Sequence, residues 1–419
     1  MRINVQRVRS GIVGHREKFP ARDGTLPCWT VSLRVGERAV RRVAGHRRRR
    51  MNILTVNCGS SSVRLAAFRS AGEGRLEMFA AVHADLTTAA DEDFLARFIA
   101  QYGLADVSVV AHRVVHGGAL LVESRCVDKA VEREIERLEP LAPLHNEQAL
   151  RWIRSCRTRF GSGIPQVAVF DTAFYSNLPD AARSYALPRL MTEKYRLRRY
   201  GFHGLAHRAM WRRWTQLHEA RAGRGRIISL QLGSGCSVTA IRDGAALDTS
   251  MGFSPLEGLV MATRCGDIDA GLLTYLQRNE KLTPDQTDRM LEKQSGLLGV
   301  SGVSGDMREL LADDGARARL AIDLFCYRAR KYLGAYLAVL GGTEGIVFGG
   351  GIGEHAPQVR ERILSGMEWC GVTLDRTANG AGGGERRISS AQSAVDVWVF
   401  AVDEAGELAR EALAVMARR

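Results

Sequence analysis

One short pattern occurs twice in this chain of 419 residues and constrains its fold more than any other feature. Residues 53–68 read ILTVNCGSSSVRLAAF, and residues 227–241 read IISLQLGSGCSVTAI. In both copies, apolar runs rich in β-branched residues flank a turn of small polar residues, which predicts strand, tight turn and strand. Gly59-Ser60 and Gly233-Ser234 align at a separation of 174 residues. A repeat of this length indicates two related domains rather than a solenoid.

The two turns have the composition of an anion-binding site. Glycine and serine leave room for backbone N–H groups and hydroxyls to close on an oxyanion. Arg64, just beyond the first turn, adds a fixed positive charge. One copy alone is as consistent with an ordinary hairpin and its solvated turn as with an anion-binding site. Two copies favour a pair of phosphate-binding turns that face one cleft.

The net charge of +13 is concentrated at the N-terminus. Residues 1–50 hold 14 Lys and Arg against 3 Asp and Glu, a net of +11, so the remaining residues carry only +2. The nearly neutral body gives no support for a nucleic-acid partner. The extension is either a basic tail or translated upstream sequence with Met51 as the natural start. We favour the second reading, because a complete strand pattern begins right after Met51.

The remaining composition excludes several classes of protein. No stretch of about 18 uncharged apolar residues is present, so we expect no membrane span. The eight cysteines form no CxxC pair, which argues against a zinc site and a disulfide framework and fits a reducing cytoplasm. No apolar segment near the N-terminus resembles a secretory signal.

Two further predicted strands carry charged residues. Residues 107–115 form an apolar run that contains Arg113, whose guanidinium needs an anionic partner in such surroundings. Residues 167–171 form a short buried strand that ends in Asp171. Ligand-binding residues of α/β folds favour the carboxyl ends of strands, although Asp171 could also serve as a turn former.

Two histidines stand one helical turn apart where residues 200–207 open a predicted helix. The glutamate of an HExxH motif is missing, so we do not expect His203 and His207 to bind zinc. We expect His207 to be structural and His203, between Gly201 and Gly204, to face a cleft.

The second half of the sequence predicts long glycine-containing loops at 257–269 and 296–308, and a strand followed by a glycine loop at 345–354. Loops of this length in a compact domain are usually functional. Because neither GxGxxG nor GxxxxGK[ST] is present, the last loop suits a nucleobase or ribose better than a Rossmann or P-loop site. We also predict a helix at 132–138, a loop at 141–146 and a second helix that follows this loop and ends at Arg159. Further helices are predicted at 316–340 and 405–419, and a last strand at 395–402.

Nine motifs in sequence order carry a family resemblance: VNCGSSSVRL, AHRVVHGG, APLHN, FDTAF, YGFHGLAH, LGSG, TRCGDID, SGLLGVSGVSGDMR and GGGIGEH. From Met51 to about Arg410, the chain resembles the acetokinase family of the actin-like, hexokinase-like, Hsp70-like ATPase superfold. The resemblance implies an α/β fold with two duplicated actin-like (ribonuclease H-like) domains around a nucleotide cleft. It places an N-terminal domain with the acyl substrate at 51–171, a nucleotide domain at 172–404, and a C-terminal helix that returns to the first domain at 405–419.

The resemblance implies reversible phosphoryl transfer from ATP to acetate, giving acetyl phosphate and ADP. It further implies Mg²⁺, with Mn²⁺ as a possible substitute, a homodimer and a cytoplasmic location. Propionate or butyrate as acceptor, and a sugar kinase or a non-catalytic ATP-binding module of the same superfold, are alternatives. A sugar kinase would use Asp171 as a general base, whereas a carboxylate is already ionised and needs none.

The resemblance also assigns roles to residues. Asn57 and Glu404 correspond to residues linked to magnesium, Arg113 to the arginine that binds the substrate carboxylate, and Asp171, His203 and Arg264 to catalytic residues. The nucleotide-binding positions are Arg64, Gln231, Leu232, Gly233, Ser234, Gly235, Asp306, Met307, Arg308, Gly351, Ile352, Gly353, Glu354 and His355.

The sequence departs from the family pattern at a few of these positions. Arg64 stands where the family usually has Lys, Ser234 and His355 where it usually has Asn, and Tyr175 where a His follows FDTAF. These departures leave nucleotide and acyl-chain preference open. The anion that Arg113 needs is either the substrate carboxylate, which we favour, or a protein carboxylate in a buried ion pair. If Arg113 is reserved for the substrate, its removal should lower kcat/KM without lowering the melting temperature.

Overall fold

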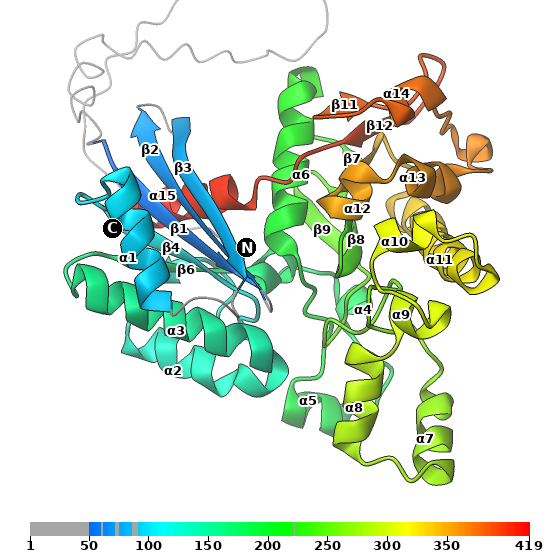
Figure 1. Ribbon diagram of the computed structural model, residues 1–419, viewed down its shortest axis with the longest axis horizontal. Coiled ribbons are helices and arrows are strands. Elements are labelled where there is room, and N and C mark those ends of the chain that lie inside the picture. The colour runs from blue at the N-terminus through cyan, green and yellow to red at the C-terminus, as the bar shows by residue number, and fades with distance from the viewer. Residues whose placement is uncertain (1–49, 60–61, 72–74, 86–90, 222) are drawn as a thin grey trace, which may run out of the picture. The chain divides into compact units, whose positions relative to one another are not determined.

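The computed structural model describes residues 50–59, 62–71, 75–85, 91–221 and 223–419 (Figure 1). Residues 1–49 lie outside this set, so the structure tests neither interpretation of the N-terminal extension. Among the described residues, no helix is long and apolar enough to span a membrane.

The first half of the described chain forms a six-stranded mixed sheet. Its strands are β1 (Asn52–Cys58), β2 (Ser62–Ala71), β3 (Arg75–Asp85), β4 (Val109–Val114), β5 (Arg125–Cys126) and β6 (Gln166–Phe170), in the order β3-β2-β1-β4-β6-β5. β1 pairs antiparallel with β2 and parallel with β4, and β4 is parallel to β6. The predicted hairpin at 53–68 is therefore confirmed, and the parallel strands of the sheet end on one edge.

The second half repeats this plan. β7 (Arg226–Leu232), β8 (Cys236–Arg242), β9 (Ala245–Thr249), β10 (Gly345–Gly349), β11 (Arg386–Arg387) and β12 (Asp396–Val399) follow the order β11-β12-β10-β7-β8-β9. Each strand pair has the same relative direction as its counterpart in the first sheet. The register shifts also correspond, at Ala67/Phe68 and at Ala240/Ile241. The duplication predicted from the two turns is thus present throughout both sheets.

Helices account for most of the remaining described chain. They are α1 (Asp91–Tyr102), α2 (Lys129–Arg137), α3 (Pro143–Phe160), α4 (Asp180–Arg183), α5 (Arg189–Tyr195), α6 (Gly204–Leu217), α7 (Ala270–Asn279), α8 (Pro284–Lys293), α9 (Gly296–Ser301), α10 (Met307–Ala312), α11 (Ala316–Leu340), α12 (Gly350–His355), α13 (Pro357–Leu364), α14 (Arg376–Gly380) and α15 (Glu404–Ala417). Short 3₁₀ turns cover Glu139–Leu141, Asp171–Tyr175, Glu219–Arg221 and Glu368–Cys370.

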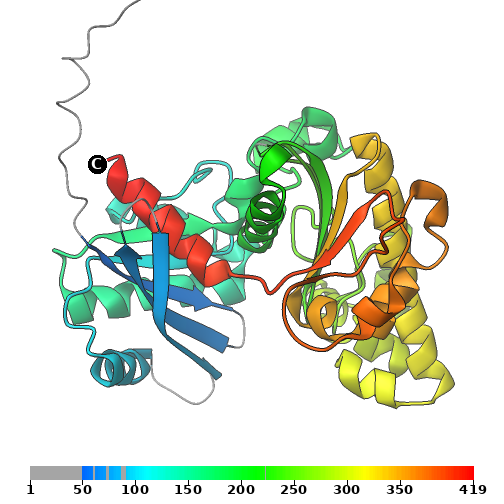
Figure 2. The same cartoon turned by 90° about the horizontal axis from the view of Figure 1, so that it is seen from above.

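Each sheet is covered by helices on both faces (Figures 1 and 2). On the first sheet, α1 and α3 bury Phe94 and Trp152 against one face, and α15 buries Leu408 and Ala412 against the other. On the second sheet, α11 covers one face and α6 the other. Because α6 also packs on α15, these two helices connect the two sheets.

Three predicted loops contain helices instead. The loop at 141–146 already holds the start of α3, because Pro143 occupies the first turn, where its fixed φ suits a helix. The loop at 296–308 contains α9 and the start of α10, and the glycine segment after β10 forms α12. Gly296 and Gly350 enter these helices with φ of +64° and +76°, so the glycines mark helix entries here.

Strand ends also differ slightly from the predictions. β4 covers only Val109–Val114 of 107–115, and β12 only Asp396–Val399 of 395–402. β6 ends at Phe170, so Asp171 begins a 3₁₀ turn just beyond the strand.

Candidate active site

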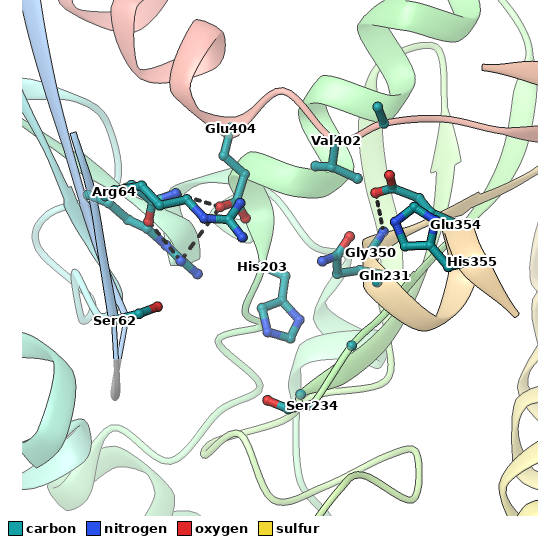
Figure 3. A pocket seen from close by; sticks show the side chains of 17 residues that line it. Ser62, Arg64, His203, Gln231, Ser234, Gly350, Glu354, His355, Val402 and Glu404 are labelled. Atoms are coloured by element: carbon teal, nitrogen blue, oxygen red, sulfur yellow. Dashed lines mark hydrogen bonds and ion pairs between the residues drawn. The ribbon is translucent and has the colours of Figure 1, made fainter. Parts of the chain in front are cut away.

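A cavity of about 480 Å³ lies where the turn after β1 faces the turn after β7 (Figure 3). Figure 3 shows Ser62 and Arg64 on the side of the first sheet, Gln231, Glu354 and His355 on the side of the second, and His203 between them. Of the residues proposed from sequence, the cavity is lined by Asn57, Arg64, Arg113, His203, Gln231, Gly233, Ser234, Gly235, Gly351, Glu354, His355 and Glu404.

A second cavity of about 430 Å³ adjoins the first. The two share Gly233, Ser234, Gly351 and His355. The second cavity has apolar side chains in its wall and is lined by Gly233, Ser234, Gly305, Asp306, Met307, Arg308, Leu311, Gly351, Ile352, His355 and Ala356. A polar cavity thus continues into a more apolar one across the glycine turn after β7.

Four of the proposed site residues line neither cavity. Leu232 is fully buried in the core of the second sheet, and a Cβ placed on Gly353 would lie 3.7 Å from the side chains of Leu232 and Phe348. Asp171 lies fully buried behind Arg113, and the guanidinium of Arg264 approaches Gly235 of the cavity wall. These four residues therefore lie next to the residues of the cavity walls rather than in the walls.

The Arg113 guanidinium already has a protein anion. Its Nε and Nη2 donate to Oδ2 of Asp171 at 3.0 and 2.7 Å, and its Nη1 donates to Oδ1 of Asn57 at 3.1 Å. The expectation that Arg113 waits for a substrate carboxylate without a protein partner is therefore wrong. A guanidinium has five N–H groups, and the described residues accept from three of them, so one on Nη1 and one on Nη2 remain for a ligand.

Burial and the charge of the partner side chain shift the pKa values of Asp171 and Arg113 in opposite directions. Burial raises the pKa of Asp171, although the neighbouring Arg113 lowers it. Burial alone would lower the pKa of Arg113, but Asp171 and Glu404 outweigh it, so the net shift is upward. The guanidinium is therefore held in its charged form at the edge of the cavity.

Asn57 and Glu404 meet beside Arg113. Nδ2 of Asn57 donates to Oε2 of Glu404 at 2.6 Å, and Nη1 of Arg113 lies 3.8 Å from the same oxygen. Among the described residues, no group of three or more His, Cys, Asp or Glu could hold a metal ion. One carboxylate with a neighbouring amide nevertheless fits Mg²⁺ bound mainly by phosphate oxygens and water, the usual arrangement in kinases.

The start of α6 brings His203 to the cavity. His203 precedes the helix with φ of +57°, and Oδ1 of Asp171 accepts a 3.4 Å hydrogen bond from the Leu205 N–H. A Cβ on Gly204 would lie 1.9 Å from the Asp171 carbonyl oxygen, so only glycine permits this approach. The YGFHG sequence therefore fixes His203 relative to Asp171.

Arg264 and His203 converge on Gly235. A Cβ placed on Gly235 would lie 3.4 Å from Nη1 of Arg264 and 3.4 Å from Nε2 of His203. Nη1 of Arg264 donates only to the Pro255 carbonyl at 3.4 Å and to Met261 Sδ at 3.6 Å, and no described carboxylate forms an ion pair with it. Burial lowers the pKa of this guanidinium. A half-buried cation without a carboxylate partner creates a site for an anion.

Asp306 and Arg308 largely satisfy each other. Asp306 caps α10 by accepting the Arg308 N–H at 2.8 Å, and its Oδ2 pairs with Nη2 of Arg308 at 2.6 Å. The hydrogen bonds from Arg308 hold the pKa of Asp306 below its usual value.

Sequence reasoning missed several lining residues. Ser62 and Gly350 lie inside the motifs VNCGSSSVRL and GGGIGEH, so the serine turn and the glycine run could have indicated them. Ala401 and Val402 lie between β12 and α15 and carry no polar signal at all.

Residues 70–410 match the model of the Acetokinase family. The chain belongs to the acetokinase family. It is 48% identical over 313 residues to acetate kinase from Solibacter usitatus, an alignment that covers 74% of this chain and 76% of that protein.

Solved structures of acetokinases share the fold. Acetate kinase from Porphyromonas gingivalis has a TM-score of 0.78 and 36% identity, covering 87% of this chain and 100% of its own. Propionate kinase from Francisella tularensis has a TM-score of 0.78 and 33% identity, with the same coverage. The two matching sheets are thus the duplicated actin-like domains of an acetokinase, as the sequence predicted.

Proposed function

We propose that this chain catalyses reversible phosphoryl transfer from ATP to acetate, giving acetyl phosphate and ADP. One observation carries the proposal: Arg264 and His203 converge on Gly235, which lines the same cavity as Arg113. Among the described residues, two N–H groups of Arg113 have no hydrogen-bond partner. That arrangement offers separate places for a transferring phosphoryl group and for a small carboxylate. The similarity to acetate kinases supports the same reaction.

The carboxylate that accepts the phosphoryl group has to be bound but not deprotonated. A carboxylic acid is ionised at neutral pH, so its oxygen can attack the γ-phosphorus without a general base. The free N–H groups on Nη1 and Nη2 of Arg113 would bind the carboxylate, while Asp171 holds the guanidinium in place. Asp171 is thus a positioning residue, because it lines neither cavity and is fully buried.

The phosphoryl group would lie at the Gly233–Gly235 turn. As the bond to the carboxylate oxygen forms and the bond to ADP breaks, charge spreads over the equatorial phosphoryl oxygens. Arg264 and His203 would stabilise that charge, and the glycine backbone permits close approach. The adjoining apolar cavity, with Met307, Leu311 and Ile352 in its wall, would hold the nucleoside.

Magnesium fits this arrangement. Glu404, assisted by Asn57, would hold Mg²⁺ or Mn²⁺ together with phosphate oxygens and water. When bound, the ion neutralises phosphate charge.

Acetate-dependent release of ADP from ATP tests the proposal. Acetate, propionate, butyrate and glucose should be supplied in parallel, with and without a chelator. We expect turnover with at least one short carboxylate, none with glucose, and loss on chelation that Mg²⁺ or Mn²⁺ restores. Turnover with glucose and with none of the three carboxylates would instead support a sugar kinase.

A pair of variants tests the cation at Gly235. Arg264→Ala should lower kcat on the order of 10³-fold, as expected for an arginine that stabilises transferred phosphoryl charge. Arg362→Ala is the matched control, because Arg362 is partly exposed, pairs with Asp323 and lines neither cavity.

The proposal extends to a homodimer in the cytoplasm. Large apolar side chains are exposed on α5 and α7, including Leu190 at 77% and Tyr275 at 62%, and no residue of α7 is buried. Such a surface is typical of a protein interface. Light scattering should give twice the mass of one chain. Activity should remain in the supernatant after membranes are pelleted.

A further inference from the structure

Three hydrogen bonds connect His203 to the interior of the second sheet. Nδ1 of His203 lies 2.9 Å from Oγ of Ser237, and the same oxygen lies 2.8 Å from Nε2 of His207. Nδ1 of His207 lies 2.6 Å from Oγ of Ser229. Ser237, His207 and Ser229 are fully buried, so water does not reach this part of the chain of bonds.

Both imidazoles are neutral at physiological pH. Burial lowers the pKa of His207 to about 3. Burial, together with Arg113, lowers the pKa of His203 well below its usual value. Each ring therefore has one N–H donor and one acceptor nitrogen, and each serine hydroxyl has one proton to donate.

Two proton arrangements satisfy all three bonds with the Ser237 proton in one of them. A third, in which both histidines donate to Ser237, would leave the buried Ser237 proton without an acceptor, because Ser237 Oγ has no other hydrogen-bond partner among the described residues. In the first, Ser229 donates to His207, His207 donates to Ser237, and Ser237 donates to Nδ1 of His203. In the second, every donor is reversed, and the Ser229 proton then needs another acceptor. Among the described residues, Ser229 Oγ has no second hydrogen-bond partner. A buried hydroxyl proton without an acceptor is costly, so the first arrangement is favoured.

The first arrangement puts the proton of His203 on Nε2. That nitrogen faces Gly235 in the cavity, and among the described residues it has no hydrogen-bond partner. An N–H group there can donate to an oxyanion, whereas the reversed arrangement would present a lone pair that repels one.

We infer that Ser237, supported by His207 and Ser229, is a positioning residue that fixes the ring of His203 and holds it as the Nε2–H tautomer, ready to donate to the transferring phosphoryl group. The tautomer follows from the hydrogen-bond partners, while its catalytic value rests on the proposed function. His207, which the sequence suggested to be structural, thus acts on the site through Ser237.

The tautomer can be tested on the wild-type protein without any substrate. In the full chain labelled with ¹⁵N-histidine, the His203 signals are assigned by their loss in His203→Gln. We expect Nε2 to be protonated and Nδ1 unprotonated. Protonated Nδ1 would overturn the inference. No substrate is present in this measurement, so a chain that makes no acyl phosphate would overturn the proposed function and not the tautomer.

The positioning role can be tested by steady-state kinetics. Ser237→Ala should lower kcat roughly 10- to 100-fold with little change in the KM of either substrate, because the lost hydrogen bond matters in the transition state. Its His203 signals should become an average of two tautomers. Ser237→Thr keeps the hydroxyl and should restore most of kcat and the single tautomer.

Ser250→Ala is the matched control. Ser250 is also fully buried next to β8, and its hydroxyl accepts the Val238 N–H at 2.9 Å without contacting either histidine. Its kcat should stay within a few-fold of wild type. A kcat in Ser237→Ala equal to that of wild type, or a loss as large in Ser250→Ala, would contradict the inference.

Discussion

Arg113 combines a structural contact with the candidate binding role. Its side chain is only 13% exposed, and its ion pair with the fully buried Asp171 joins β4 to the turn after β6. Breaking such a pair from one side leaves an uncompensated buried charge. The stability of the site and its affinity for a carboxylate therefore depend on the same guanidinium.

Arg113→Ala should accordingly destabilise the fold as well as the reaction. We expect a loss of about 3–5 kcal/mol in the free energy of unfolding, measured by urea denaturation. Adding Asp171→Asn should recover part of that loss, because the amide carries no charge. Arg137→Ala is the matched control and should cost less than about 1 kcal/mol, since the Arg137 side chain is 56% exposed in its ion pair with Glu134. An unchanged stability of Arg113→Ala would show that the ion pair contributes little.

The sequence indicated that Arg113 needs an anion but could not say which one. Arg113 lies opposite Val169 in the register of β4 and β6. Side chains two residues apart in a strand share a face, so Asp171 follows on the side of Arg113. This placement requires β4 and β6 to be neighbours, and 58 residues separate Arg113 from Asp171. Local patterns do not contain such long-range strand order.

At the scale of elements, one buried arginine holds the glycine-rich α12. Arg360 of α13 is fully buried, and its Nη1 donates to the carbonyls of Gly353 and Glu354 at 2.8 and 3.0 Å. Its Nε and Nη2 donate to Asn379 of α14 at 2.8 and 2.7 Å. Burial lowers the pKa of Arg360 to about 10, so it stays charged at neutral pH. The cation thereby fixes the end of a helix that lines both cavities.

Arg360→Met should therefore weaken both stability and nucleotide binding. Removal of four donated hydrogen bonds from buried acceptors should cost about 3 kcal/mol in urea unfolding. Loosening of α12 should raise the KM for ATP about tenfold, while the KM for acetate changes little. Arg362→Met, two residues along the same helix, should leave both quantities nearly unchanged because Arg362 is partly exposed. Equal effects of the two substitutions would rule out this role of Arg360.

The same elements show why helices were missed in the sequence. Glycine lowers helix propensity, and the segments at 296–301 and 350–355 are short and rich in it. Their helical form depends on tertiary contacts such as those of Arg360. Long periodic segments depend less on such contacts, and the helix predicted at 316–340 matches α11.

At the scale of the whole molecule, α6 and α15 connect the duplicated sheets through charged contacts. Nε and Nη2 of Arg212 donate to the two carboxylate oxygens of the fully buried Glu407, at 2.9 and 3.0 Å. One turn away on each helix, Arg208 pairs with Glu411 at 2.5 Å. The duplication was readable from the two turns, but this contact was not, because neither helix forms part of the repeated pattern.

A chain that begins at Met51 should fold and react like the full chain. Every helix and strand described here begins at or after Asn52, and the Met51 backbone nitrogen donates to Oγ of Ser70 at 2.8 Å, which a terminal amine can still do. The melting temperature and kcat/KM should both be retained. A large fall in either would assign a role to residues 1–50.

The identity of the phosphoryl acceptor is the central claim, and trapping of the product tests it most directly. With ATP, a magnesium salt and acetate, hydroxylamine should convert the acyl phosphate into a hydroxamate in amounts that match the ADP formed. Omitting acetate should abolish both signals, and Arg264→Ala should reduce both together. ADP formation without hydroxamate, with acetate, propionate and butyrate all tried at high enzyme concentration, would contradict phosphoryl transfer to a carboxylate.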